Sequence, residues 1–239
     1  MKHVKLGVNI DHVATLRQAR KEKNPDTVEA ARVVYSSGGD MVVMHLRQDR
    51  RHIQEADLER VRREVKGILH LEIAAIPEME KLALLIHPDS VCLVPESARE
   101  VTTQGGLKLN GRNKELEKTI KNLSGAGIEV GVFCDPEPQV IRTAHNMGAD
   151  SIELCTSSYS GAWGKKLQAR ELEKLQLAGF LVKELKLQLH AGHGLDYYNV
   201  APVARIEGMD CLNIGFSIIS RAMFVGLKTA VSEMKRLIQ

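Results

Sequence analysis

The chain has 239 residues, of which 44% are hydrophobic, and 33 Lys and Arg residues against 30 Asp and Glu residues give a net charge of +3. This length can bury a large core, and barrels of alternating strands and helices commonly reach this size as one domain. Because the charge is nearly balanced and the sequence contains no block of like charges, we expect no nucleic-acid partner.

The cysteines and the N-terminal stretch bear on the cellular compartment of the protein. The four cysteines, Cys92, Cys134, Cys155 and Cys211, lie far apart in apolar segments and show no C-x-x-C spacing. Such thiols are typical of the reduced core of a cytosolic protein. The stretch MKHVKLGVNIDHV lacks the apolar region of a signal peptide, and no window approaches the roughly 20 apolar residues that a membrane span needs. We therefore expect a cytoplasmic protein without a membrane partner.

Short apolar runs recur along the chain, separated by charged stretches whose apolar residues have helical spacing. The runs predict strands over residues 4–10, 41–46, 68–74, 91–94, 128–134, 151–155, 187–191 and 211–214. Helices are predicted in PDTVEAARVVYSSG, EADLERVRREVKGIL, NKELEKTIKNLSGAG, PEPQVIRTAHNMGA and ARELEKLQLAGFLVKEL. Glycines at positions 38, 127 and 148 stand just past three of the predicted helix ends, as is usual for helix termination.

Eight predicted strands that alternate with helices indicate an α/β fold with a parallel sheet. In a chain of this length they favour a closed (β/α)8 TIM barrel, with a single domain over residues 1–239. An open flavodoxin-like or Rossmann sheet is the alternative, but no G-x-G-x-x-G motif follows the first predicted strand.

Polar side chains collect where the predicted strands end, which is where a TIM barrel builds its active site. In chain order they are Asn9 and Asp11, His45 and Arg47, Glu72, Glu96, Asp135, Glu153 and His193. Side chains alternate along a strand, so His45 and Arg47 share one face while Leu46 points the other way. We therefore expect the polar set to converge on one mouth of the barrel.

The stretch HLRQDRRHI crowds cations together directly after the second predicted strand. Arg47 and the two histidines, His45 and His52, are suited to hold a small anion such as a phosphate ester. Arg50 and Arg51 are explained equally well by surface ion pairs with neighbouring carboxylates. This stretch is the first of three candidate anion sites.

Two further stretches are suited to phosphate. In HAGHGLDYYNV, glycines flank His193 and allow the backbone to approach an oxyanion closely, whereas His190 is expected to be a core or interface histidine. In LNIGFSIISRA, Gly215 precedes a predicted helix after the eighth strand, a place where barrels often bind phosphate. Two phosphate sites predict two phosphorylated substrates, or one substrate with two phosphates.

The candidates for acid–base catalysis are His45, Glu72, Glu153 and His193, with Glu72 shifted towards its neutral form by apolar neighbours. The same four residues could instead hold a divalent ion, as in a metal-dependent sugar-phosphate isomerase or aldolase, although no H-E-x-x-H motif occurs. A non-catalytic sensor of phosphorylated ligands is a third hypothesis. The polar stretch from residue 95 to 114 is long for a barrel loop, and we expect residues 97–110 to act as a lid.

Seven segments, which stand in order at the ends of successive predicted strands, resemble the pyridoxine 5′-phosphate synthase family over essentially the whole chain. They are GVNIDHVATLRQAR, HLRQDRRHI, LEIA, CLVPE, TTQGGL, AGHGLDYYNV and NIGFSIISRA. The resemblance implies condensation of 3-amino-2-oxopropyl phosphate with 1-deoxy-D-xylulose 5-phosphate to pyridoxine 5′-phosphate, with loss of inorganic phosphate and water, in vitamin B6 biosynthesis. It also implies a barrel with extra helices, assembly as a homo-octamer, and catalysis without a metal or organic cofactor.

The resemblance also implies a role for particular residues. Those that match contacts with the amino-ketone phosphate are Asn9, Arg20, Gly194, Gly215 and Phe216, and those that match contacts with the phosphosugar are Asp11, His12, Arg47, His52 and Thr102. His45, Glu72 and His193 match acid–base residues, and Glu153 matches a residue that stabilises the transition state. The chain departs from the family pattern at Phe216, where N-I-G-H is expected, at Cys155, where E-L-H-T is expected, and at His190, where Asn commonly precedes A-G-H.

Overall fold

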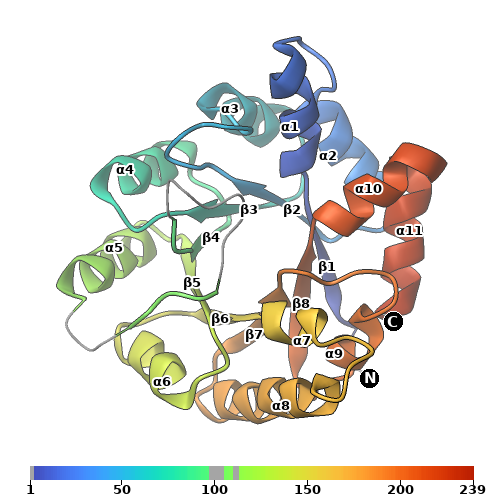
Figure 1. Ribbon diagram of the computed structural model, residues 1–239. Coiled ribbons are helices and arrows are strands. Elements are labelled where there is room, and N and C mark those ends of the chain that lie inside the picture. Colours follow the sequence, from blue (N-terminus) through green and yellow to red (C-terminus); the bar gives the residue numbers. More distant parts are fainter. Residues whose placement is uncertain (1–2, 97–104, 110–112) are drawn as a thin grey trace.

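The computed structural model describes residues 3–96, 105–109 and 113–239. Among these residues, parallel strands close into a barrel in chain order, so each strand pairs with the next along the chain and the last pairs with the first (Figure 1). The strands are β1 (Lys5–Asn9), β2 (Met41–His45), β3 (Ile68–Ile73), β4 (Ser90–Leu93), β5 (Glu129–Cys134), β6 (Ser151–Cys155), β7 (Gln188–Gly192) and β8 (Met209–Ile214). The prediction of a (β/α)8 barrel is confirmed, and the open-sheet alternative is wrong.

Helices surround the barrel on its outer face (Figure 1). They are α1 (Asp11–Arg20), α2 (Thr27–Ser36), α3 (Glu55–Glu64), α4 (Pro77–Ile86), α5 (Lys114–Gly125), α6 (Pro138–Asn146), α7 (Ser157–Gly161), α8 (Gln168–Glu184), α9 (Val200–Ala204), α10 (Phe216–Val225) and α11 (Leu227–Leu237). Among the described residues, two helices follow each of β1 (α1 and α2), β6 (α7 and α8) and β8 (α10 and α11), which confirms the extra helices. No helix within the described ranges has the length and apolar character to cross a bilayer.

Alternation along the strands separates the main core from the barrel interior. On β3, Leu69, Leu71 and Ile73 point outward and belong to the large apolar cluster under the helices. His70 and Glu72, which lie between them, point inward. Barrels of this class usually fill the interior with layers of branched apolar side chains. Here the interior also holds buried polar side chains, among them His70, Glu153, His190 and Asn213.

A buried ion pair fixes the first helices around the mouth. The two guanidinium nitrogens Nη1 and Nη2 of Arg17 on α1 each donate to a carboxylate oxygen of Asp57 on α3, at 2.6 Å. The hydroxyl of Thr27 at the start of α2 donates to the same carboxylate at 3.0 Å. All three side chains are buried, so this group ties three helices together away from solvent.

Candidate active site

A cavity of about 1140 Å³ opens at the carboxyl ends of the strands. The residues predicted for the site that line it are Asn9, Asp11, His12, His45, Arg47, His52, Glu72, Glu153, His193, Gly194, Gly215 and Phe216. The structure thus brings most of the polar strand-end residues together at one mouth, whereas Asp135 lines a second hollow, and the roles of these residues stay predictions. Arg20 is exposed at the last residue of α1 and is not part of this lining as far as the described residues define it, while Thr102 and most of the predicted lid lie outside the described residues.

His45 stands between two carboxyl groups at one side of the cavity. Its Nε2 lies 2.8 Å from Oε1 of Glu96, and its Nδ1 lies 3.6 Å from Oε2 of Glu72. The backbone N–H of His45 donates to Asp11 at 2.8 Å, which fixes the start of the loop after β2. The imidazole is thus hydrogen-bonded to Glu96, whereas proton exchange with Glu72 requires a closer approach than 3.6 Å.

The pKa values of the two carboxyl groups beside His45 are shifted in opposite directions. Burial raises the pKa of Glu96, but hydrogen bonds from His45 and from the backbone N–H of Gln48 outweigh it, so the net pKa is lowered. Burial raises the pKa of Glu72 well above its usual value, and the nearby charges of Glu153 and Asp11 raise it further. Glu96 is thus shifted towards the carboxylate form and Glu72 towards the neutral acid, and such a divergence is what acid and base functions at one pH require.

Glu153 enters the floor of the cavity from β6. Its Oε2 accepts a hydrogen bond from the amide of Asn213 on β8 at 2.6 Å. Burial raises its pKa to about 7, against the lowering effect of hydrogen bonds from Asn213 and from the thiol of Cys92. Gly192 leaves room for this carboxyl group, because a Cβ there would lie 2.5 Å from Oε1 of Glu153.

His193 has a strained backbone at the end of β7. Its φ is +80°, and that of Gly194 is +83°, so two successive residues are left-handed. The hydroxyl of Thr156 holds this turn: it lies 2.8 Å from the carbonyl oxygen of Gly192 and 2.6 Å from that of His193, and these two acceptors share its one proton. Strain of this kind in a residue other than glycine is common at functional sites. Burial lowers the pKa of His193, which favours the neutral imidazole that a general base requires.

The cations after β2 divide into two groups. Arg47 is buried and lines the cavity together with His52, whose pKa is lowered by burial. Arg50 points away to Glu55, at 2.8 Å, and to Glu78. Arg51 pairs with Asp49 at 2.6 Å, although it also reaches the cavity rim. The surface ion pairs predicted for Arg50 and Arg51 are thus present.

Helix α10 begins directly after Gly215, and its first residues, Phe216 and Ser217, line the cavity, so the N-terminus of the helix borders it. A helix N-terminus of this kind is suited to bind an anion through N–H donors and the helix dipole. The ring of Phe216 packs edge-on against the ring of His12 on α1, with 5.3 Å between ring centroids. The ring of Phe216 therefore packs against a neighbouring helix, which leaves the backbone N–H groups at this position as the candidate anion donors.

Two residues that matter to the geometry had no predicted role. Glu96 follows β4 in the segment LVPE, and the sequence marks it only as a polar residue at a strand end. In the structure it lies closer to the His45 ring than Glu72 does, at 2.8 Å. Asn213 lies inside the apolar-looking run CLNI, where alternation places it on the same face as Cys211, and it holds Glu153. The sequence offers one indication of the role of Asn213: it is a polar residue at a strand position that faces the barrel interior.

One group of residues at the mouth could hold a cation. A ligand atom of Asp11, one of His45 and one of Glu72 lie within 4.8 Å of one another. However, Asp11 already accepts from the backbone N–H of His45, and Nε2 of His45 already lies 2.8 Å from Oε1 of Glu96, so two of the three side chains have protein partners. The donor set therefore suits proton transfer better than metal coordination.

A TIM barrel whose mouth combines such acid–base groups with cationic and helix-terminus anion sites defines an enzyme class that acts on small phosphorylated substrates. The model of the family described as pyridoxal phosphate biosynthesis protein PdxJ matches residues 6–239. The chain belongs to this family, whose members serve vitamin B6 biosynthesis.

Individual relatives agree with the family match. The chain is 51% identical over 237 residues to a pyridoxine 5′-phosphate synthase of Elusimicrobium minutum, covering 99% of this chain and 98% of that one. It is 49% identical over 234 residues to a pyridoxine 5′-phosphate synthase of a Cyanothece species, covering 98% of each. A thiamine phosphate pyrophosphorylase from Pyrococcus furiosus superposes with a TM-score of 0.61 at 16% identity, covering 98% of this chain and 95% of that one, and it shares the fold alone.

Proposed function

We propose that the protein is a pyridoxine 5′-phosphate synthase, which condenses 3-amino-2-oxopropyl phosphate with 1-deoxy-D-xylulose 5-phosphate. The observation that carries this proposal is the gathering of His45, Glu72, Glu153 and His193 around one cavity of about 1140 Å³, with anion sites at its edge. This volume is slightly above that of ordinary ligand sites, so the cavity can hold two small phosphorylated substrates together. Sequence relatives with that activity, about half identical over the full length, support the same conclusion.

The proposed roles follow from the protonation states of the groups. Schiff-base formation needs a base to take protons from the amine and an acid to release water from the carbonyl carbon. His193, with its lowered pKa, suits the base, and Glu72, with its raised pKa, suits the acid. His45 would return protons through its contacts with Glu72 and Glu96. Glu153 would stabilise positive charge that develops on the substrate nitrogen.

The two phosphates are proposed to occupy opposite sides of the mouth. The proposed contacts with the amino-ketone phosphate lie at the end of β1, in the turn after β7 and at the start of α10. They are Asn9, Gly194, Gly215 and Phe216. Those for the phosphosugar lie around the ends of β1 and β2, at Asp11, His12, Arg47 and His52. Thr102 and closure of a lid remain proposals for the residues that the structure does not describe.

A homo-octamer is proposed from the family resemblance. Apolar side chains beside the cavity support self-association: on α10, Phe216 is 71% exposed, Met223 67% and Phe224 86%. Assembly would also give Arg20, which is exposed on its own chain, a cavity to contact on a neighbouring copy. We further propose one catalytic domain over residues 1–239 and a cytoplasmic location, in line with the free, buried state of all four cysteines.

The test is incubation of the purified protein with both substrates, with absorbance used to detect pyridoxine 5′-phosphate. We expect product without added metal, and none when either substrate is omitted. Activity that a chelator abolishes and a divalent ion restores would favour a metal-dependent isomerase or aldolase instead. Binding of both substrates without any product would favour the ligand sensor.

A further inference from the structure

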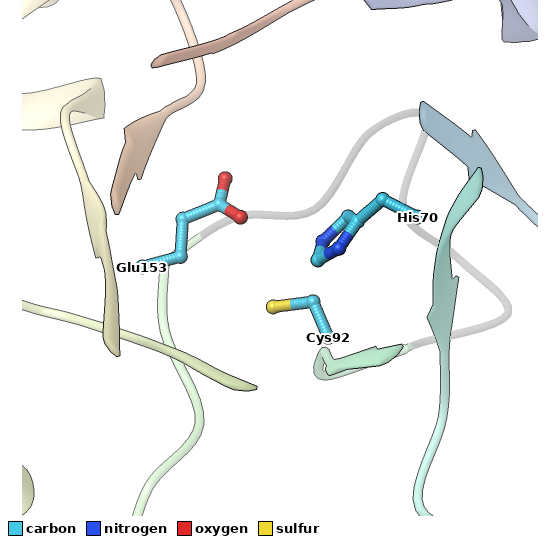
Figure 2. A group of neighbouring side chains, drawn as sticks. All are labelled: His70, Cys92 and Glu153. Atoms are coloured by element: carbon cyan, nitrogen blue, oxygen red, sulfur yellow. The ribbon is translucent and has the colours of Figure 1, made fainter. Parts of the chain in front are cut away.

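Below the catalytic mouth, three side chains from three different strands point toward one another inside the barrel (Figure 2). They are His70 on β3, Cys92 on β4 and Glu153 on β6, and one ligand atom of each lies within 4.8 Å of the others. His70 and Cys92 are each 1% exposed. Of the three, only Glu153 lines the cavity above, so the group lies beneath the proposed active site.

One nitrogen atom of His70 has no hydrogen-bond partner among the described residues. The Nδ1 atom of His70 lies 2.6 Å from the hydroxyl of Ser90, while its Nε2 atom is buried with no hydrogen-bond partner among the described residues. Buried polar atoms nearly always have a partner, so one left over calls for an explanation. If Nδ1 donates to Ser90, Nε2 carries a lone pair. That is the tautomer of a metal-binding histidine whose other nitrogen is held by a second residue.

From this geometry we propose that His70, Cys92 and Glu153 form a site for a borderline-soft divalent transition ion such as Zn²⁺, and that its occupation inhibits the enzyme. Imidazole, thiolate and carboxylate are ligands that Zn²⁺ and Co²⁺ accept, whereas Mg²⁺ and Ca²⁺ prefer oxygen ligands alone. Three protein ligands leave a further coordination position for water. The inhibitory part rests on the proposed function, because the metal would occupy the Glu153 carboxylate.

Binding at this site is an exchange of protons for a metal ion, without any change of oxidation state. The thiol of Cys92 releases its proton to solvent when its sulfur bonds the ion, and Glu153 releases one wherever it is protonated. An ion enters from the mouth, because Glu153 is the member of the group that borders the cavity.

The first test is a Co²⁺ titration of the whole protein in a non-chelating buffer, with the thiolate-to-cobalt charge-transfer absorbance as the readout. We expect one equivalent in the wild type, loss of the band in Cys92→Ser, and affinity weakened at least about tenfold in His70→Asn. Cys211→Ser is the matched control, since Cys211 is also buried in the barrel interior but lies outside the group, and it should keep the band. No band in the wild type, or a band that survives Cys92→Ser, overturns the proposal.

The second test separates this site from the mouth and from the proposed function. Zn²⁺ should inhibit product formation in the wild type, and His70→Asn should need at least about tenfold more Zn²⁺ while keeping its metal-free turnover. Equal inhibition of both proteins would place the inhibitory ion elsewhere, for example at Asp11. It would refute the proposal that an ion bound at His70, Cys92 and Glu153 inhibits the enzyme. If no synthase activity exists at all, the Co²⁺ titration still decides whether the ion binds.

Discussion

Replacing Glu153 with Gln should stabilise the protein at alkaline pH while it impairs catalysis. Burial raises the pKa of this carboxyl group from the usual 4.5 to about 7, so ionising it in the folded barrel is unfavourable. The difference corresponds to about 3 kcal/mol, as an upper estimate. Glutamine keeps the size of the side chain and an oxygen that can accept from Asn213, but it carries no charge to bury.

The sign of the pH dependence follows from linkage. A carboxyl group with a raised pKa in the folded state favours folding below its unfolded pKa, and this contribution is lost as pH rises through the folded pKa. The wild type should therefore lose stability between about pH 4.5 and about pH 7.5, and the Gln variant should lose less. The two proteins should be similar at the acidic end, and near pH 8 the variant should be more stable by as much as about 3 kcal/mol.

The assay is urea denaturation at a series of pH values and one fixed protein concentration, followed by the fluorescence of Trp163, the only tryptophan in the sequence. Glu173→Gln, on the exposed side of α8, removes a carboxylate outside the barrel and should follow the wild-type profile. Turnover of Glu153→Gln should fall at the same time. Parallel profiles for the wild type and Glu153→Gln would show that burial of this carboxylate costs nothing and would refute the reasoning.

Three further predictions concern activity, substrate affinity and stability. Glu72→Gln should lower turnover at least about 100-fold with little change in substrate affinity, as for loss of a general acid, and near wild-type steady-state rates would contradict this. Gly215→Val should severely weaken binding of the amino-ketone phosphate in calorimetry, because its Cβ would lie 2.9 Å from the Cβ of Asn9, whereas Phe216→His should change affinity by no more than about 1 kcal/mol. Asp57→Ala should cost about 3–5 kcal/mol of unfolding free energy by leaving a buried guanidinium unpaired, and an unchanged melting temperature would argue against that.

The sequence by itself determined the barrel and most of the mouth. Strand and helix periods depend on local alternation of apolar and polar residues, and the strands found differ from those predicted by only one or two residues at their ends. The placement of His45 and Glu72 at one mouth followed from parallel strands, because such strands end on the same side of the barrel. The family motifs also lie at strand ends, so order along the chain was enough to predict that they converge.

Only the tertiary structure decided how side chains from distant strands pair. Glu96 and His45 are 51 residues apart, and Asn213 and Glu153 are 60 apart, so nothing local in the sequence predicts either hydrogen bond. Closure of the barrel sets which inward-facing residues share a level, and burial at that level sets the pKa of Glu153. The same closure brings His70 and Cys92 beneath that carboxylate and leaves Arg20 on the outside of its own chain.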